Sequence, residues 1–460
     1  MSAPLWTSEA IAAATGGTAT APFAATGVSI DSRSVEAGDL FVALAGARDG
    51  HEFVSGALAR GGAGSLVSKA VEGPAVVVED VFKALEMLGI AARVRAPLAR
   101  RGAVTGSVGK TSVTRAVEAG LRLAGRAHAS VKSYNNHIGV PLTLARMPAD
   151  TLRAVFEIGM NHAGEIGPLA RMVAPHAVAI TTVGPVHIEN FPDGEAGVAL
   201  AKAEIFEGLE PGGVAVLNAD DRWFGQLQSA ALEAGATVRS FGASPLADAR
   251  LTAFKAREGG AVVEAVVDGA PLSIDLLQSG SHWGANSLCV LLMLEALDVD
   301  RETALKALAH FAPLEGRGAE RRVPVAGGEF VLIDESYNAN PISMAAALKN
   351  LGARPVAGRR IVALTDMLEL GDDAPKYHAG LAEPIEAAAI DLVFCAGLLM
   401  KSLWDALPQN RRGGYAKTAD ELASLITGAV GPGDAVMVKG SNGSRAGAVA
   451  AALSRLGEMV

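Results

Sequence analysis

The chain has 460 residues, a length typical of about three domains. Half of the residues are hydrophobic and 19% are charged, so the chain can build a large core, and wholesale disorder is excluded. The net charge of −9 argues against a nucleic-acid binder that depends on general attraction to phosphates. A local site can still hold a nucleotide.

Cysteine usage and hydropathy predict a cytoplasmic protein. Cys289 and Cys395 lie in apolar runs, where buried and inert thiols are expected, and they form neither a disulfide framework nor a zinc pattern. The first residues carry Glu9 and no early Lys or Arg, so they lack the charged start of a secretion signal. No uninterrupted apolar run reaches about 18 residues, so we expect no transmembrane helix and no membrane insertion.

The Gly/Ala-rich segment from Met1 to about Leu98 contains a predicted strand at 39–44. Before it, Ser32 and Arg33 carry donors that can hold a pyrophosphate or a carboxylate by charge-assisted hydrogen bonds. An ordinary solvated turn would have the same composition, and the residues alone leave both interpretations open.

A glycine-rich turn at 104–111 is the clearest functional motif. It reads Val-Thr-Gly-Ser-Val-Gly-Lys-Thr and precedes apolar residues four apart at Val113, Val117 and Leu121, as on one helix face. The order of strand, glycine-rich turn, Lys-Thr and helix is typical of a phosphate-binding loop. Backbone N–H groups and the positive end of the helix then surround an anion.

Within this loop, Lys110 can reach terminal phosphates and the Thr111 hydroxyl can ligate Mg²⁺. Val104 stands where the usual pattern has its first glycine, so only the Gly-x-x-Gly-Lys-Thr core matches. A glycine-serine turn without a nucleotide is the alternative.

The chain then continues as an α/β unit with a parallel sheet. Strands are predicted at 154–158 and 177–183, with a helix at 164–173 between them. Ligands gather beyond the carboxyl ends of such strands, where Glu157 and His187 lie. A carboxylate and an imidazole beside a phosphate loop suggest metal ligands or phosphate positioning, although either residue alone is more often structural.

Two further polar residues lie on predicted helices. Lys202 falls within a helix at 195–209, where a solvated surface lysine is the ordinary expectation. Asn286 opens an apolar helix that runs to about Leu297, and it can act as a helix cap or contact a nucleotide base.

From about Gly318 the alternation of strands and helices starts again. Strands are predicted at 330–333, 361–364, 392–395 and 435–438, which makes a second doubly wound unit of ordinary domain size. No Gly-x-Gly-x-x-Gly turn follows its first strand, so NAD binding is unsupported. Pro341 is expected to start the next helix.

With these residues in view, the chain resembles the Mur ligase family along its whole length, most closely its D-alanyl-D-alanine-adding branch. The stretches 105–111, 134–143, 157–162 and 334–341 carry the resemblance, and the front segment is similar to the family's UDP-sugar-binding domain. The resemblance implies a three-domain α/β protein. A UDP-muramoyl-peptide-binding domain would span 1–98, a central ATP-binding parallel-sheet domain 99–317, and a Rossmann-like domain for nucleotide and dipeptide 318–460.

The implied activity is ATP-dependent formation of an amide bond. ATP phosphorylates the terminal carboxylate of a UDP-N-acetylmuramoyl-tripeptide, and the amine of D-alanyl-D-alanine attacks the acyl phosphate. ADP and phosphate leave, and the product is the pentapeptide precursor of peptidoglycan. The resemblance also implies a monomer whose domains close around the ligands, and it leaves the third peptide residue open between diaminopimelate and lysine.

The resemblance assigns roles residue by residue. Contacts to ATP are implied for Thr105, Gly106, Ser107, Val108, Gly109, Lys110, Thr111, Ser112, Asn286, Arg317, Asp334 and Tyr337. Mg²⁺ ligands are implied at Thr111, Glu157, His187 and Lys202, the last as a carbamylated lysine. Catalytic roles are implied for Lys110, Glu157, His187 and Lys202. Substrate contacts are implied for Ser32, Arg33, Asp49, Gly50, His51, Asn135, Asn136, Asn338 and Asn340.

The sequence also departs from the family. Trp283 stands where an Asn is usual, and the residues after Ser441, including Arg445, follow the family pattern only loosely. The alternatives are a sibling ligase that adds a single amino acid or acts on folate, and a nucleotide-gated binding protein without ligase chemistry.

Overall fold

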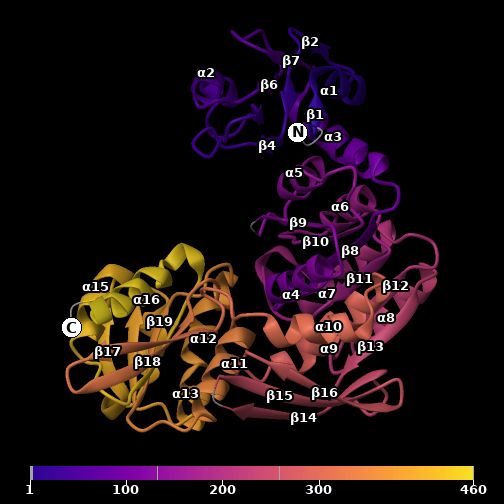
Figure 1. Ribbon diagram of the computed structural model, residues 1–460. Coiled ribbons are helices and arrows are strands. Elements are labelled where there is room, and N and C mark those ends of the chain that lie inside the picture. Colours follow the sequence, from indigo (N-terminus) through magenta and orange to yellow (C-terminus); the bar gives the residue numbers. More distant parts are fainter. Residues whose placement is uncertain (1–3, 132, 258, 459–460) are drawn as a thin grey trace.

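The computed structural model describes residues 4–131, 133–257 and 259–458. Their sheets fall into three α/β groups along the chain. In Figure 1 the first group lies at the top, the central group at the right and the last at the lower left. The predicted α/β class is confirmed, and the boundaries at 98 and 317 stay a prediction.

The first group is built on a small five-stranded sheet. Its strands, in spatial order, are β2 (Thr18–Ala19), β7 (Ala75–Val77), β6 (Gly64–Val67), β5 (Asp39–Val42) and β4 (Gly27–Ser29). A separate pair consists of β1 (Trp6–Thr7) and β3 (Ala24–Ala25). The helices are α1 (Ser8–Thr15), α2 (Val54–Ala59) and α3 (Val81–Arg95).

Helix α3 joins the first group to the central one. Asp80 starts the helix, because its carboxylate accepts the N–H groups of Phe82 and Lys83. The helix packs against α5 (Gly139–Ala145), whose Leu142 and Ala145 lie in the core of the first group. The first two groups therefore share apolar packing.

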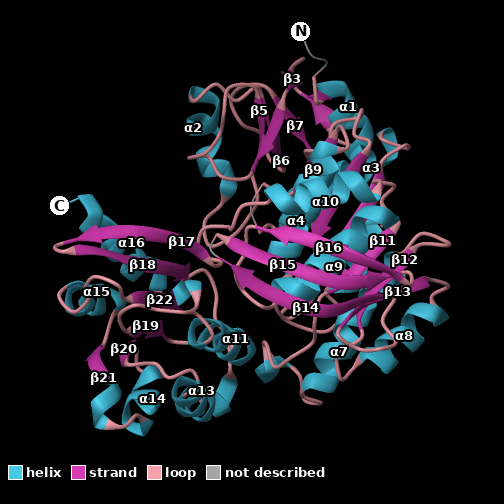
Figure 2. Ribbon diagram, turned by 60° about the horizontal axis from the view of Figure 1, so that its bottom comes forward, coloured by secondary structure: helices cyan, strands magenta, loops and turns pink. Residues whose placement is uncertain are grey.

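The central group contains a nine-stranded sheet. Its strands, in spatial order, are β16 (Ala270–Leu276), β15 (Gly260–Val267), β14 (Ala249–Arg257), β13 (Thr237–Gly242), β12 (Val214–Asn218), β11 (Ala177–Ile180), β8 (Arg100–Thr105), β10 (Arg153–Glu157) and β9 (Ala127–Ala129). Strands β9 to β14 pair in parallel, whereas β14, β15 and β16 form an antiparallel ribbon at one end (Figure 2). Since β8 lies between β10 and β11, the carboxyl ends of all three meet.

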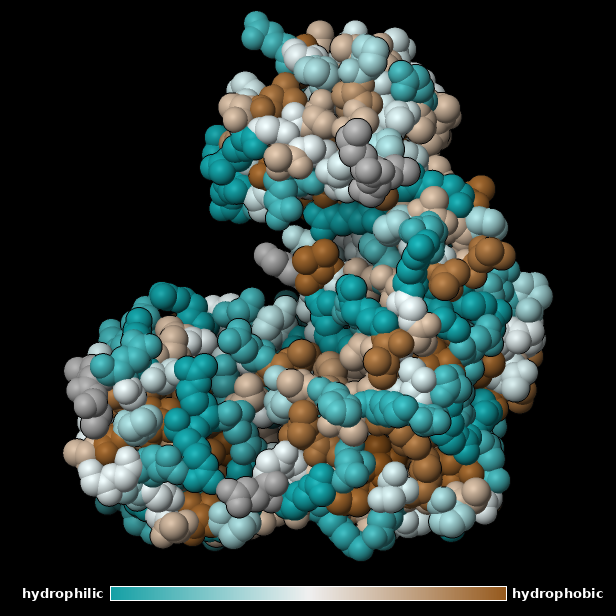
Figure 3. All heavy atoms as spheres, in the orientation of Figure 1, coloured by the Kyte–Doolittle hydropathy of each residue, from teal (hydrophilic) through white to brown (hydrophobic). Residues whose placement is uncertain are grey.

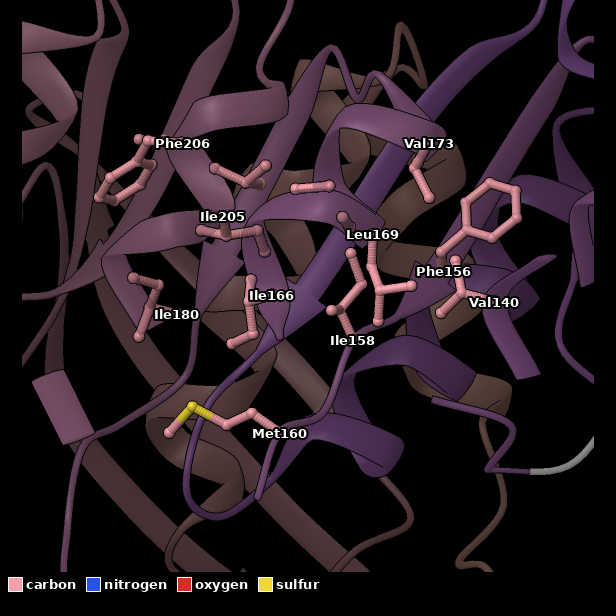
Figure 4. Close-up of a cluster of buried hydrophobic side chains, with 14 of the residues drawn as sticks. Val140, Phe156, Ile158, Met160, Ile166, Leu169, Val173, Ile180, Ile205 and Phe206 are labelled. Carbon is pink, nitrogen blue, oxygen red and sulfur yellow. The ribbon is translucent and has the colours of Figure 1, made fainter. Parts of the chain in front are cut away.

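Helices cover both faces of this sheet. They are α4 (Lys110–Leu123), α5, α6 (Ile166–Val173), α7 (Glu195–Ala203), α8 (Phe224–Glu233), α9 (Trp283–Ala296) and α10 (Arg301–His310). On one face the aliphatic and aromatic side chains of β10, α6 and the segment after α7 form one cluster (Figure 4). On the other face Val113, Val117 and Leu121 are fully buried in the same cluster as α9 residues, which confirms the predicted apolar face of α4.

The last group is a six-stranded sheet with helices on both sides. Its strands, in spatial order, are β17 (Ala319–Val325), β18 (Gly328–Glu335), β22 (Ala435–Lys439), β19 (Arg360–Thr365), β20 (Leu392–Ala396) and β21 (Arg412–Ala416). The helices are α11 (Pro341–Gly352), α12 (Ala374–Ala379), α13 (Ala382–Ala387), α14 (Met400–Ala406), α15 (Ala419–Thr427) and α16 (Ala446–Arg455). Pro341 begins α11 as predicted, behind a capping box made by Asn340 and Ser343.

The end of one predicted helix differs from expectation. The predicted helix at 195–209 ends at Ala203, and a 3₁₀ turn, Glu204–Gly208, follows it. This turn aims the Glu204 carboxylate at the first amides of α6, where it accepts N–H bonds from Gly164 and Gly167. Gly208 lies so close to Ala170 that a Cβ would meet its backbone at 2.1 Å.

Both cysteines are buried free thiols, as predicted, and burial raises the pKa of each. Over the described ranges, no helix combines the length and the apolar character that a bilayer crossing requires.

Candidate functional site

The phosphate-binding loop connects β8 to α4 through two glycines with positive φ. Gly106 has φ of 146° and Gly109 has φ of 90°, conformations that side chains other than glycine rarely adopt. A Cβ at Gly106 would lie 1.9 Å from Thr181 Oγ1, so the turn has no room for a side chain. No side chain caps α4 at Gly109, which leaves its first N–H groups free for an anion.

We expect Gly106→Ala to lower the free energy of unfolding by about 1–3 kcal/mol, because both the clash and the φ angle oppose it. Chemical denaturation monitored by circular dichroism measures the loss. Gly225→Ala is the matched control, since Gly225 lies in α8 with open space around its Cβ position. Equal stability of the two variants would contradict the role assigned to Gly106.

Beside the loop, Glu157 ends β10 and accepts hydrogen bonds from two side chains. Its Oε2 accepts the Thr111 hydroxyl at 2.7 Å, and its Oε1 accepts the Asn135 amide at 2.7 Å. Glu157 is 3% exposed, so both bonds lie out of water. Lys110 Nζ donates to the Gly106 carbonyl at 2.6 Å, and burial is the main cause that lowers its pKa. Glu157 opposes that shift through its charge.

His187 lies in the loop after β11, where its Nδ1 lies 2.8 Å from the carboxylate of Glu369 in the last group. Burial lowers the pKa of its imidazole, and the charges of Lys110 and Lys202 lower it further, whereas Glu369 raises it. No role for Glu369 was predicted from the sequence.

Lys202 corrects the expectation of a solvated lysine. Its side chain is 2% exposed on α7, and its ammonium group has no hydrogen-bond or ion-pair partner among the described residues. Burial and the charge of Lys110 hold the pKa of Lys202 well below its ordinary value. A buried lysine without a counter-charge is destabilising and is retained chiefly at functional sites.

The last group contributes cations and carboxylates of its own. The guanidinium of Arg317 lies 4.2 Å from the centre of the Tyr337 ring, and burial lowers its pKa although Glu157 and Glu335 raise it. Lys439 Nζ donates to Glu335 at 3.3 Å and to the Asn338 carbonyl at 3.0 Å. The carboxyl ends of β18 and β22 thus supply Glu335 and Lys439, which the sequence analysis did not single out.

These parts line one cleft of about 580 Å³ between the central and last groups. Most of the predicted site residues line it: Ser107, Val108, Gly109, Lys110, Thr111, Ser112, Asn135, Asn136, Glu157, His187, Asn286, Arg317, Tyr337, Asn338 and Asn340. On the face shown in Figure 3 the molecule is also hollowed between the first and last groups.

Of the other predicted residues, Asp334 lies away from this cleft. Asp334 borders a different hollow, and its carboxylate accepts the N–H groups of Gly316 and Ser336. Asn286 is not the helix cap offered as one alternative, because α9 already begins at Trp283 behind His282. The side chain of Asn340 lines the cleft but is also committed to the first turn of α11.

Two of the predicted residues of the first group, Asp49 and His51, are bonded to each other. His51 Nδ1 lies 2.6 Å from Asp49, while His51 Nε2 accepts the Ser68 N–H at 2.9 Å. Lys69 Nζ donates to Asp49 at 2.6 Å, and these bonds lower the pKa of the Asp49 carboxyl. Arg33 is 84% exposed and ion-paired with Asp31, so its charge faces water.

Metal-binding capacity in the cleft rests on few protein ligands. In the part of the chain that the structure describes, no group of three or more His, Cys, Asp and Glu side chains is arranged to hold a metal ion. The oxygens of Thr111 and Glu157 are nonetheless adjacent to each other and to the phosphate loop.

One cleft thus combines a phosphate loop, a buried carboxylate and cations from two domains. This combination is typical of a nucleotide-dependent enzyme that brings anions together. Family models agree: the Mur ligase catalytic domain matches residues 24–112, the Mur ligase middle domain 104–294, and the Mur ligase glutamate ligase domain 321–442. The chain belongs to the Mur ligase family, which confirms the resemblance.

Individual relatives agree as well. The UDP-N-acetylmuramoyl-tripeptide–D-alanyl-D-alanine ligase of Rickettsia prowazekii is 32% identical over 90% of this chain and 92% of its own length. The ligase of the same name from Escherichia coli is 35% identical over 80% of this chain and 81% of its own. A crystal structure of MurF from Acinetobacter baumannii superimposes with a TM-score of 0.85 at 26% identity, over 98% of this chain and 99% of that one.

Proposed function

We propose that this protein is an ATP-dependent amide ligase that joins D-alanyl-D-alanine to a UDP-N-acetylmuramoyl-tripeptide during peptidoglycan synthesis. The observation that carries the proposal is the single cleft in which the phosphate loop meets Glu157, Arg317 and Lys439. Similarity to ligases of that name, over most of both chains, supports the choice of substrates.

In this proposal the phosphate loop binds the β- and γ-phosphates of ATP. The free amides at the start of α4 and the ammonium of Lys110 bind the phosphate oxygens. Arg317, which lines the same cleft, neutralises charge that develops on the transferring phosphoryl group. Asn286 and Tyr337 line the same cleft and contact the nucleoside.

The side chains beside the loop fit Mg²⁺. Magnesium is usually held by one or two carboxylates, substrate phosphates and water, and Thr111 and Glu157 supply such oxygens next to the loop. When bound, the ion would neutralise phosphate charge. His187 and Lys202 would hold a second ion. The lowered pKa of Lys202 favours the neutral amine, which can add to CO₂ and release a proton to give a carbamate, an anionic oxygen ligand.

The reaction then proceeds in two transfers. The tripeptide carboxylate attacks the γ-phosphorus, the bond to the ADP oxygen breaks, and an acyl phosphate forms. The neutral amine of the dipeptide attacks the acyl carbon, the C–N bond forms, and phosphate leaves as the amine loses a proton. Lys110 and Arg317 act by holding anionic groups together that would otherwise repel each other.

The remaining predicted residues divide between the substrates. The UDP-sugar binds on the first group, to Ser32, Arg33, Asp49, Gly50 and His51. The peptide is bordered by Asn135 and Asn136. The dipeptide is bordered by Asn338 and Asn340. Because these ligands are assigned to different domains, closure of the domains gates turnover.

The test is ADP release under defined substrate mixtures. We expect release only when ATP, the UDP-muramoyl tripeptide and D-alanyl-D-alanine are all present, with tripeptides carrying diaminopimelate and lysine assayed in parallel. Turnover with a single amino acid but not with the dipeptide would reject the proposal in favour of a sibling ligase. Nucleotide binding without any turnover would favour the non-catalytic binding protein.

A further inference from the structure

The last group contacts the central group at the loop that carries His187. A Cβ at Gly184 would lie 2.0 Å from Cδ1 of Ile342 on α11, so this glycine permits close contact. Three residues on, His187 meets Glu369 at 2.8 Å. Beyond it, the Cβ position of Gly371 lies 3.1 Å from the Cβ of Glu189. Segment 184–189 thus contacts the last group at two places, at Ile342 on α11 and at residues 369–371.

The same loop is tied to the phosphate loop at its other side. Ser107 Oγ donates to the Gly184 carbonyl at 3.1 Å and accepts the Gly184 N–H at 2.9 Å. The Ser107 N–H also donates to the Thr182 carbonyl at 2.7 Å. Hydrogen bonds and packing therefore connect the nucleotide side of the cleft to the last group through this one loop.

The two partners of the ion pair are both held in an unusual backbone conformation. His187 has φ of 52° and Glu369 has φ of 63°, in the left-handed region that costs a residue with a side chain about 1 kcal/mol or more. Two loops that are far apart in sequence therefore each place a strained residue at the point where they contact each other. Strained backbone conformations of this kind are common at functional sites.

The ion pair also determines which ring nitrogen of His187 carries a proton. A carboxylate only accepts hydrogen bonds, so the Nδ1 that faces Glu369 must donate. The neutral form of an imidazole ring has one N–H, and the contact with Glu369 places it on Nδ1. Nε2 is then left with a free lone pair, the form in which imidazole binds a metal ion.

We propose that Glu369 is a positioning residue of the ligase site, which fixes the Nδ1–H tautomer of His187 when the last group docks on the central one. The metal side of the cleft is therefore complete only in the docked arrangement. The inference rests on the proposed function for the reaction it serves, whereas the contact itself is independent of that reaction.

The experiment reads the tautomer directly in the metal-free protein. Long-range ¹H–¹⁵N spectra of histidine-labelled protein at pH 8 report Nδ1–H against Nε2–H, and His187→Gln assigns the signal. We expect a single Nδ1–H tautomer in the wild type, because the Glu369 carboxylate can only accept. In Glu369→Ala we expect a mixture of tautomers and a 10- to 100-fold weaker Mn²⁺ affinity, the usual effect of losing such a partner.

Asp372→Ala is the matched control, because Asp372 is an exposed carboxylate of the same segment. It should leave the His187 spectrum and Mn²⁺ binding as in the wild type. An unchanged tautomer in Glu369→Ala would overturn the inference, as would equal Mn²⁺ affinity in the two variants. Because neither readout requires turnover, a failure of the proposed ligase activity would be seen separately, in the ADP-release assay.

Discussion

Replacement of Lys110 by methionine is expected to lower kcat by roughly a factor of 10²–10³, the usual cost of removing one donor that stabilises a transition state. Lys110 is the cation of the phosphate loop, and its Nζ is held by the Gly106 carbonyl at 2.6 Å. In the ligand-free site its charge is buried and only partly offset by Glu157, with Arg317 opposing it. The phosphates of ATP provide the missing counter-charge, so the lysine is poised for an anion.

Methionine keeps the length and apolar stem of the side chain and removes the charge. The variant should therefore stay folded, with a melting temperature equal to or above that of the wild type, because an under-compensated buried cation is gone. Steady-state ADP release and nucleotide titration separate the loss of kcat from the loss of ATP affinity. Lys401→Met, at an exposed ion pair on α14, is the control. Wild-type turnover in Lys110→Met would contradict the assignment of the loop.

Several parts of the site could be predicted from sequence because they follow local rules. The phosphate loop has its residues in consecutive positions, and the strand-end rule identified Glu157. The same rule, applied to the last group, would have found Glu335 at the end of β18 and Lys439 at the end of β22. Neither was predicted as a site residue, because the rule was applied only to the strands of the central group.

Other parts depend on contacts between distant segments. Nothing near Lys202 in sequence distinguishes a buried lysine from a solvated one, because its burial arises where α7 packs into the central core. Glu369 is a loop residue whose meaning appears only when the last group meets His187. The side chains that flank Asn286 likewise could not show that its helix begins three residues earlier, at Trp283.

In the last group the sequence predicted the interior strands of the sheet but not the two edge strands. Strands at 330–333, 361–364, 392–395 and 435–438 were found as β18, β19, β20 and β22, because buried parallel strands are continuous apolar runs. Edge strands lack that signal. β17 and β21 carry mixed sequences, AERRVPV and RGGYA, and are recognisable only by the neighbours they pair with.

Replacement of Lys202 by methionine is expected to separate function from stability. Turnover should fall by roughly 10² or more, since the residue supplies an electrostatic contact of the site. The free energy of unfolding should rise by about 1–3 kcal/mol at neutral pH, because a buried polar group without a partner is removed. Both effects follow from an amine that is 2% exposed and has no counter-charge among the described residues.

The direction of the pKa shift of Lys202 determines how the stability of the protein changes with pH. Burial holds the pKa of Lys202 in the native state well below that of the unfolded chain, so between the two values the unfolded chain binds one proton more. The stability of the wild type then falls as pH falls through that window, whereas Lys202→Met lacks this dependence. The advantage of the variant should therefore be larger at pH 7 than at pH 10, as measured by denaturant unfolding.

Bicarbonate distinguishes a plain amine from a carbamate at this position. If the amine takes up CO₂, ¹³C-bicarbonate should give a carbamate resonance in the wild type and none in Lys202→Met, and it should stabilise the wild type alone. The anionic group would then offset the charge of Lys110, which in the uncarbamylated state only adds to the cost of protonating Lys202. Normal turnover of Lys202→Met would contradict the assignment of Lys202 to the site. Absence of the carbamate resonance in the wild type would contradict carbamylation, but not the presence of a buried amine.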